Sequence, residues 1–278
     1  MTKDKIDLVY VSIKKDRKAL EFAIEHAKKN VENLGKIFVV SKNCLTNKAI
    51  WFSEDKFPFS KEEVKKRMKI TNKREGWYFQ QLLKYYSPLL IPNISKNILI
   101  SCSDSLFLSK VKFIDEKGKF LFNVFENMEV HKPYLKHIHN LFPGITKFQQ
   151  QHDTCHHMIF NKAIIKEMIN KVEKRTGNLF WKEYLSSVEK KEIEKAGASD
   201  YESYYNYMFF YHKNKCKIRK LKWFNDGLFL NKNYINFHKF LKYDGISFHS
   251  HQSNKKITHL LNPKNWLQLI ISYLKSER

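Results

Sequence analysis

Residues 95–108, SKNILISCSDSLFL, carry the strongest signal in the chain, because a buried apolar run leads directly into a polar cluster. Residues 98–100 predict the end of a short buried strand, and a second apolar run begins at Leu106. A carboxylate at the end of a buried strand is costly unless hydrogen bonds or a cation compensate it. Open α/β sheets bind ligands at the carboxyl ends of their strands. Asp104 is therefore the first candidate site residue; the alternative is that it only caps a turn.

The N-terminal 41 residues have the order strand, helix, strand. Residues 6–13 are rich in β-branched and aromatic residues and predict a buried strand. Asp16 offers an N-cap for a helix that Gly35 is expected to end, and residues 36–41 predict the second strand. This order predicts a parallel pair with a right-handed crossover. The loop at 12–16 would then lie at the carboxyl edge, where a nucleotide could bind.

The composition of the whole chain limits the class of protein. Its 278 residues are 42% hydrophobic and 15% aromatic, which is enough for one large α/β domain. No apolar run is long enough to span a membrane, the N-terminus does not resemble a secretory signal, and four scattered cysteines fit a reducing cytosol. A cytoplasmic location is therefore expected. The net charge of +23 favours anionic partners without identifying them.

The remaining sequence predicts alternating helices and strands. Glycine-rich dinucleotide and P-loop motifs are both absent. Residues 42–59 look irregular, Ser60 and Glu63 form a capping box, and a helix over 75–86 is expected to stop at Pro88. Further helices are predicted at 164–172, 179–195 and 234–243, strands at 120–125 and 217–224, and a loop-rich segment at 126–150.

Three other polar clusters could meet Asp104 in the fold. They are His156 with His157, Asp200 with Glu202 in a tyrosine-rich stretch, and His249 with His251. An aspartate, a histidine and a diphosphate together would suit a divalent cation. The alternatives are ordinary core or surface histidines and a solvated helix face for the carboxylates. The spacing of residues 152–157 matches no standard zinc ligand set.

Several stretches of sequence, taken together, carry a family resemblance. They are IDLVYVSIKKD (6–16), GWYFQQLLKYY (76–86), SCSDSLFL (101–108), and HHMIFNKAIIKEM (156–168) with SDYESYYNY (199–207). With them, the chain resembles a family of bacterial and viral glycosyltransferase-like proteins that have the GT-A nucleotide-sugar fold. The resemblance covers most of residues 6–225.

This resemblance implies one α/β domain over residues 1–278, with a mixed, mainly parallel central sheet flanked by helices. A Rossmann-like half, about 1–108, would bind the nucleotide-sugar. The other half, about 109–278, would bind the acceptor.

The resemblance also implies roles for individual residues. Asp104 falls on the second Asp of a D-x-D motif, which binds Mn²⁺ or Mg²⁺ and, through the metal, the donor diphosphate. Cys102 falls on the first Asp, and because a thiol is a poor ligand for hard cations, metal dependence stays open. Asp200 is the candidate general base, with Glu202 as its alternative.

Each expected ligand has its own set of residues. The nucleotide-sugar is expected at Ser12, Lys14, Asp16, Gln81, Lys84, Ser103 and Asp104. The acceptor or the diphosphate is expected at His156, His157 and Tyr204, and the metal at Asp104 and His249.

The implied function is transfer of a sugar from a UDP- or GDP-sugar to a glycan or lipid-linked acceptor in the synthesis of surface polysaccharide or glycoconjugates. An inverting mechanism is slightly favoured. Trp181 and Tyr204 could stack on sugar rings, and the basic surface could hold the protein at an anionic membrane. No specific nucleic acid is expected as a partner. Two alternatives stay open, an inactive glycosyltransferase-like binding protein, which Cys102 favours, and a basic nucleic-acid-binding protein.

Overall fold

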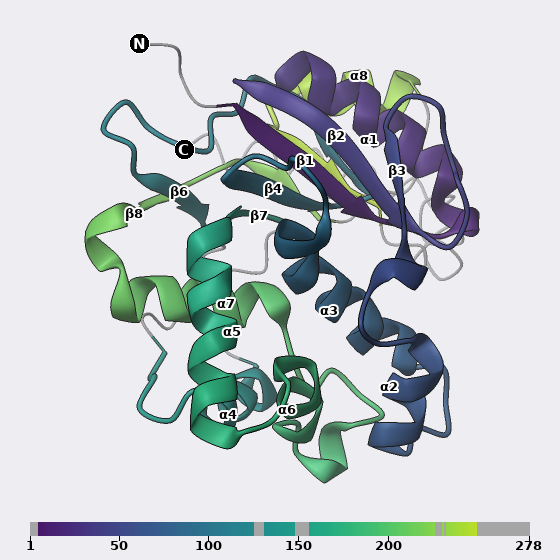
Figure 1. The fold of residues 1–278 in the computed structure, drawn as a ribbon. Coiled ribbons are helices and arrows are strands. Elements are labelled where there is room, and N and C mark those ends of the chain that lie inside the picture. Colours follow the sequence, from purple (N-terminus) through teal and green to yellow (C-terminus); the bar gives the residue numbers. More distant parts are fainter. Residues whose placement is uncertain (1–4, 125–130, 148–155, 226–229, 231, 249–278) are drawn as a thin grey trace, which may run out of the picture.

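The computed structural model describes residues 5–124, 131–147, 156–225, 230 and 232–248. Its central feature is a five-stranded sheet with the order β3-β2-β1-β4-β7. The strands are β1 (Ile6–Val11), β2 (Leu34–Ser41), β3 (Ile50–Ser53), β4 (Asn97–Cys102) and β7 (His157–Asn161). Strands β1 to β4 run parallel, and β7 pairs antiparallel with β4 (Figure 1). The predicted mixed, mainly parallel sheet is therefore confirmed.

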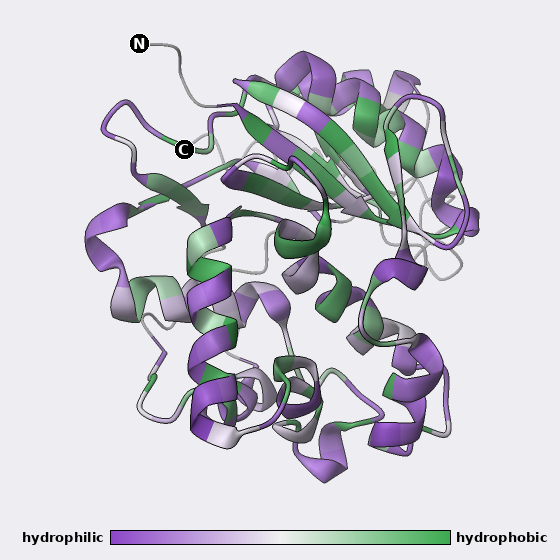
Figure 2. Cartoon of the chain, in the orientation of Figure 1, coloured by the Kyte–Doolittle hydropathy of each residue, from purple (hydrophilic) through white to green (hydrophobic). Residues whose placement is uncertain are grey.

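Helices cover both faces of this sheet. Helix α1 (Arg17–Asn30) lies on one face, and α3 (Glu75–Leu90), α5 (Lys162–Thr176) and α7 (Asp200–Tyr211) lie on the other (Figure 1). Strands enclosed on both faces need apolar side chains on both, so they appear in the sequence as continuous apolar runs. Figure 2 shows this pattern, with mostly apolar central strands and polar residues on the outward sides of the helices.

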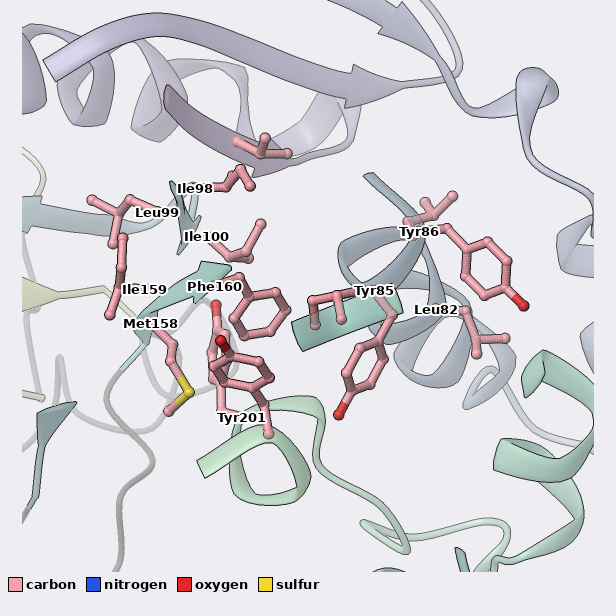
Figure 3. Packing of buried hydrophobic residues seen from close by; sticks show 14 of the residues in the cluster. Leu82, Tyr85, Tyr86, Ile98, Leu99, Ile100, Met158, Ile159, Phe160 and Tyr201 are labelled. Carbon is pink, nitrogen blue, oxygen red and sulfur yellow. The ribbon is translucent and has the colours of Figure 1, made fainter. Parts of the chain in front are cut away.

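The core next to β4 is built from segments far apart in the sequence. Ile98 and Ile100 of β4 lie beside Phe160 of β7 and Tyr85 of α3 (Figure 3). The rings of Tyr85 and Phe160 stack with centroids 5.9 Å apart. Each fully buried side chain of this size contributes roughly 1.5–3 kcal/mol relative to an exposed one. The same hydrophobic cluster extends from Ile6 to Trp223, so it crosses the predicted boundary near residue 108.

The first helix and its neighbours differ in extent from the prediction. Helix α1 ends at Asn30, and Gly35 lies inside β2 instead of ending the helix. A side chain at position 35 would place its Cβ 2.3 Å from Asp7 Oδ1, so glycine is required there by close packing. Helix α3 continues past Pro88, because the NH of Ile91 still donates to the carbonyl of Ser87 at 3.1 Å.

Other segments also depart from the sequence-based prediction. The irregular segment contains β3, and the loop-rich segment contains α4 (Lys132–Leu141). The helix predicted at 179–195 is shorter, as α6 (Phe180–Ser186). The strand predicted at 217–224 is split into β8 (Cys216–Arg219), which pairs with β6 (Phe120–Asn123), and β9 (Trp223–Phe224). The capping box that opens α2 (Lys61–Met68) is confirmed.

A small second sheet continues from the polar cluster after β4. It has the order β5-β10-β9, with β5 at Ser105–Phe107 and β10 at Gly245–Ser247. Helix α8 (Lys232–Phe240) precedes β10. Within the part of the chain that the structure describes, no helix is both long and apolar enough to cross a lipid bilayer.

Candidate functional site

The carboxyl ends of β1 and β4 lie side by side. Val11 pairs with Cys102 in the sheet, so Ser12 and Ser103 leave the two strands at the same edge. The NH of Ser12 donates to the carbonyl of Val40 at 3.1 Å, which fixes the residue. Its buried hydroxyl oxygen has no hydrogen-bond partner among the described residues. A buried polar atom without a partner is costly, so this hydroxyl is available to a ligand or to water.

Asp104 carries the second unsatisfied oxygen at this edge. Its Oδ1 is buried and has no hydrogen-bond partner in the described ranges. Burial, with a smaller contribution from the negative charge of Asp16, raises the pKa of Asp104 to about 6, although Lys84 and a hydrogen bond from Ser105 oppose the rise. The carbonyl of Asp104 accepts a hydrogen bond from the NH of Phe248 at 2.9 Å. The backbone is thus held in place, while one carboxylate oxygen, Oδ1, stays available to a ligand.

Cys102 holds its proton at this edge. Burial raises the pKa of its thiol to about 11, even though the Lys84 ammonium favours the thiolate. Its Sγ lies 3.9 Å from the hydroxyl of Tyr201, and its NH donates to the carbonyl of His156 at 2.8 Å. A protonated thiol does not bind a hard cation such as Mg²⁺.

A buried ion pair lies next to Cys102. The Nζ of Lys84 is 3.1 Å from Oδ2 of Asp200, and each side chain is only 6% exposed. Burial alone would lower the pKa of Lys84, but Asp200, assisted by Cys102 and Asp104, outweighs this effect and the pKa is raised. The ammonium also lies 4.3 Å from the centre of the Tyr201 ring. Lys84 therefore brings a permanent positive charge close to the carboxyl edge.

Glu202 belongs to a different environment. Residues two apart on a helix do not share a face, and Glu202 is directed toward Lys147, whose Nζ lies 3.5 Å from its Oε1. The side chain of Asn206 donates to its Oε2 at 3.1 Å. Ser199, which caps α7, accepts a hydrogen bond from the NH of Glu202 at 3.2 Å. The two carboxylates predicted as alternative bases are thus held by different lysines.

Two side chains that were predicted to bind a ligand instead form hydrogen bonds within the protein core. Gln81 is buried, donates to the carbonyl of Ala198 at 3.3 Å and accepts from the hydroxyl of Tyr184 at 2.5 Å. Tyr204 is fully buried, and its hydroxyl accepts from the NH of Asn161 at 2.9 Å.

Trp181 is also buried, with its ring 5.8 Å from that of Phe59. Its ring and that of Tyr204 are therefore part of the core. Their position contradicts the expectation that these two rings stack on a sugar.

The two histidines after residue 155 differ in exposure. His157 is fully enclosed by aromatic rings, and burial holds its pKa well below the usual value, so it is neutral. Its Nε2 lies 2.5 Å from the side-chain nitrogen of Asn123. His156 is half-buried beside β4. His249 lies outside the described residues.

The loop after β1 brings two more predicted residues to this edge. Lys14 is exposed, and Asp16 is half-buried at the start of α1. Burial raises the pKa of Asp16, and the neighbouring Lys15 opposes the rise. Ser103 is buried between Cys102 and Asp104.

The structure adds two residues that the sequence did not single out, Tyr201 and Lys147. Tyr201 contacts both Cys102 and Lys84, but one tyrosine among four in its segment carries no distinguishing pattern. Lys147 is one of many lysines, and only its position opposite Glu202 separates it from the others. The S-x-x-E pattern from Ser199 to Glu202 was a usable local signal for the start of α7.

The described residues do not include any group of three or more His, Cys, Asp or Glu side chains that could hold a metal ion. The unpartnered Oδ1 of Asp104 nevertheless suits one bond to a hard cation. A cation at this position would need most of its ligands from a bound diphosphate or from water. The residues thus fit a metal that binds together with substrate, and they do not form a preassembled metal cage.

Comparison with known proteins gives one structural likeness and no match in sequence. Neither a family model nor a curated protein matches the chain. Among solved structures, the chain is similar to the apo form of mouse xyloside xylosyltransferase 1. The alignment has 10% sequence identity and a TM-score of 0.41, and it covers 89% of this chain and 98% of that one. A likeness at this level does not establish a shared activity.

Proposed function

We propose that this protein is a glycosyltransferase that binds a nucleotide-sugar at the carboxyl edge of β1 and β4. The observation that carries the proposal is the pair of buried, unpartnered oxygens, Ser12 Oγ and Asp104 Oδ1, beside the buried ammonium of Lys84. Ligands of open α/β sheets bind at such an edge. The sequence motifs at 76–86, 101–108 and 199–207 support the same assignment.

The donor diphosphate would be stabilised mainly by charge. Asp104, and His249 outside the described residues, are the proposed ligands of a Mn²⁺ or Mg²⁺ ion, with the remaining ligands supplied by the diphosphate. Such a cation neutralises charge on a leaving phosphate group. Lys84 supplies a positive charge of its own. Because the thiol of Cys102 does not serve as a metal ligand, we propose that the metal binds only weakly without the donor.

Asp200 is the proposed general base. Its side chain lies next to Cys102 and Asp104 through the contact with Lys84, whose Nζ is 3.1 Å from its Oδ2, and a carboxylate at this position can accept the proton of an acceptor hydroxyl. Glu202 is less suitable, because Lys147 and Asn206 hold it on another side of α7. One base next to the acceptor is what an inverting transfer needs, so inversion is slightly favoured.

The substrates are proposed as a UDP- or GDP-sugar and a glycan or lipid-linked acceptor in surface glycoconjugate synthesis. The protein would act in the cytoplasm, and an anionic membrane face where lipid-linked acceptors reside is compatible with its net charge of +23. The second candidate, a glycosyltransferase-like protein that binds nucleotides without transfer, is favoured by one observation, the thiol that takes the place of a metal-binding carboxylate.

Thermal-shift measurements with UDP, GDP and their sugar conjugates, each with and without Mn²⁺, test the proposal. We expect at least one to raise the Tm of the native chain, and Asp104→Asn to reduce the Mn²⁺-dependent part of the rise. Asp55→Asn is the matched control, because it changes an exposed aspartate that follows β3, which β2 separates from β1 in the sheet. Absence of any shift with every nucleotide would refute the proposal.

Donor turnover then separates the two candidates. Asp200→Asn should abolish sugar transfer and leave the nucleotide-dependent Tm shift in place. Nucleotide binding without hydrolysis or transfer of any sugar would instead support the inactive binding protein. Full turnover in Asp200→Asn would remove this residue as the base.

A further inference from the structure

A cavity of about 680 Å³ lies apart from the candidate donor site, and we call it the basic cavity. It is formed by the C-terminal end of α2, the end of α6 and the segment that leads from α6 toward α7. Five of its eleven lining residues are cationic, whereas lysine and arginine make up 51 of the 278 residues in the chain. The cationic residues are Arg67, Lys69, Lys190, Lys191 and Lys195. Lysine and arginine are therefore more than twice as frequent in this lining as in the chain overall.

The positive charge of the basic cavity is largely uncompensated. Within the described ranges, Lys69, Lys190 and Lys191 form no ion pair, and Lys195 meets only Glu192, at 3.9 Å. Glu194 is the single acidic residue among the described lining residues. Its carboxylate accepts hydrogen bonds from the NH and the hydroxyl of Thr71, and these lower its pKa. Five cations and one anion leave a net charge of +4 around one concave space.

Arg67 is held in position at the wall of the cavity. Its Nε donates to the carbonyl of Lys182 at 3.2 Å, and its Nη2 donates to the hydroxyl of Ser186 at 3.0 Å. A guanidinium has five NH donors, so three remain for another acceptor. A fixed planar fork of this kind matches the oxygens of a phosphate group.

We propose that the basic cavity binds a phosphate ester, with Arg67, Lys190 and Lys191 as its main contacts. The volume lies within the range of about 300–1,000 Å³ that small-molecule sites occupy. The apolar lining side chains, among them Met68, Leu185 and Val188, would contact the carbon skeleton that carries the phosphate. A phosphorylated carbohydrate and the headgroup of an anionic phospholipid present this same chemistry. The inference does not depend on the proposed transferase activity.

The test uses the full chain and two probes at an ionic strength of about 0.15 M. Isothermal titration with inorganic pyrophosphate measures binding of a soluble phosphate. Co-sedimentation with phosphatidylcholine vesicles, with or without phosphatidylglycerol, measures binding to a lipid headgroup. The cavity variant is Lys190→Glu/Lys191→Glu, which reverses the charge of two exposed lysines that form no ion pair with the described part of the chain.

The matched control is Lys117→Glu/Lys166→Glu. It reverses two exposed lysines that do not line the cavity, so it changes the net charge by the same amount. The melting temperature of both variants should stay close to that of the native chain, because none of these side chains is buried. A change in binding can then be assigned to the position of the charges.

We expect the cavity variant to weaken binding of at least one probe by about tenfold or more, since charged hydrogen bonds are lost, while the control changes it by less than about twofold. Loss with pyrophosphate assigns the site to soluble phosphate esters, and loss with vesicles alone assigns it to a lipid headgroup. Equal effects of the two variants would overturn the proposal, because net charge and not the position of the lysines would then account for binding. Absence of binding of both probes would overturn it as well.

Discussion

At Asp104, burial of the carboxylate opposes the stability of the fold. The ordinary pKa of an aspartate, 3.8, applies to the unfolded chain, and the folded chain raises it to about 6. Because folding disfavours the ionised form, Asp104 costs nothing at pH values below 3.8. The cost grows as the pH rises from about 4 to 6 and is fully present above that range.

Asp104→Asn should therefore stabilise the protein at pH 8, by about 1–3 kcal/mol, and leave its stability unchanged at pH 4. Urea unfolding at the two pH values measures the difference. An equal effect at both would show that the ionisation of Asp104 does not limit stability.

The Lys84–Asp200 pair gives a second prediction at the residue scale. Lys84→Met leaves the buried carboxylate of Asp200 without its cation, so the free energy of unfolding should fall by about 3–5 kcal/mol. The double variant Lys84→Met/Asp200→Leu removes both charges and should regain most of this loss. Unfolding by denaturant compares the native chain, the single variant and the double variant. A double variant no more stable than Lys84→Met would contradict the ion pair as the cause.

At the scale of the element, β1, β2 and the loop before β4 are joined through one carboxylate. Asp7 is buried near the start of β1, and it accepts hydrogen bonds from the NH groups of Lys36 and Ser95, each at 2.7 Å. Gly35 leaves the space that this carboxylate occupies. A side chain at 35 would have to displace a group fixed by two hydrogen bonds.

Gly35→Ala should therefore lower the free energy of unfolding by about 1–3 kcal/mol, as overpacking does in other cores. Gly76→Ala is the matched control, because the nearest atom to its added Cβ is 3.7 Å away and the position is helical. That variant should be neutral or stabilising by up to about 1 kcal/mol. Equal stability of the two variants in thermal unfolding would contradict the packing argument.

At the scale of the whole molecule, the net charge of +23 predicts nonspecific binding to nucleic acid. Fluorescence anisotropy with duplexes of unrelated sequence should give similar affinities, and binding should weaken by at least about tenfold between 50 and 200 mM salt. Strong preference for one sequence, retained at the higher salt concentration, would favour the nucleic-acid-binding alternative over the transferase.

Local pattern explains which parts of the fold were predictable. The strands at 6–11 and 97–102 are buried on both faces, and this burial requires apolar runs that the sequence displays directly. The capping box at Ser60 is likewise a contact between residues three apart. The predicted end of α1 was wrong, because Gly35 is needed for close packing against Asp7 and not for the conformational freedom that ends helices.

The sequence by itself determined the parallel pairing of the first two strands and the presence of a carboxylate at the end of β4, because both depend on the order of residues along the chain. The mixed, mainly parallel sheet was expected from the family resemblance. Only the tertiary structure decided that Lys84 neutralises Asp200, that Glu202 faces Lys147, and that Tyr204 belongs to the core. These outcomes depend on which helix faces meet when segments far apart in sequence pack on the sheet. Burial and pairing are properties of that packing, so no local pattern of residues could specify them.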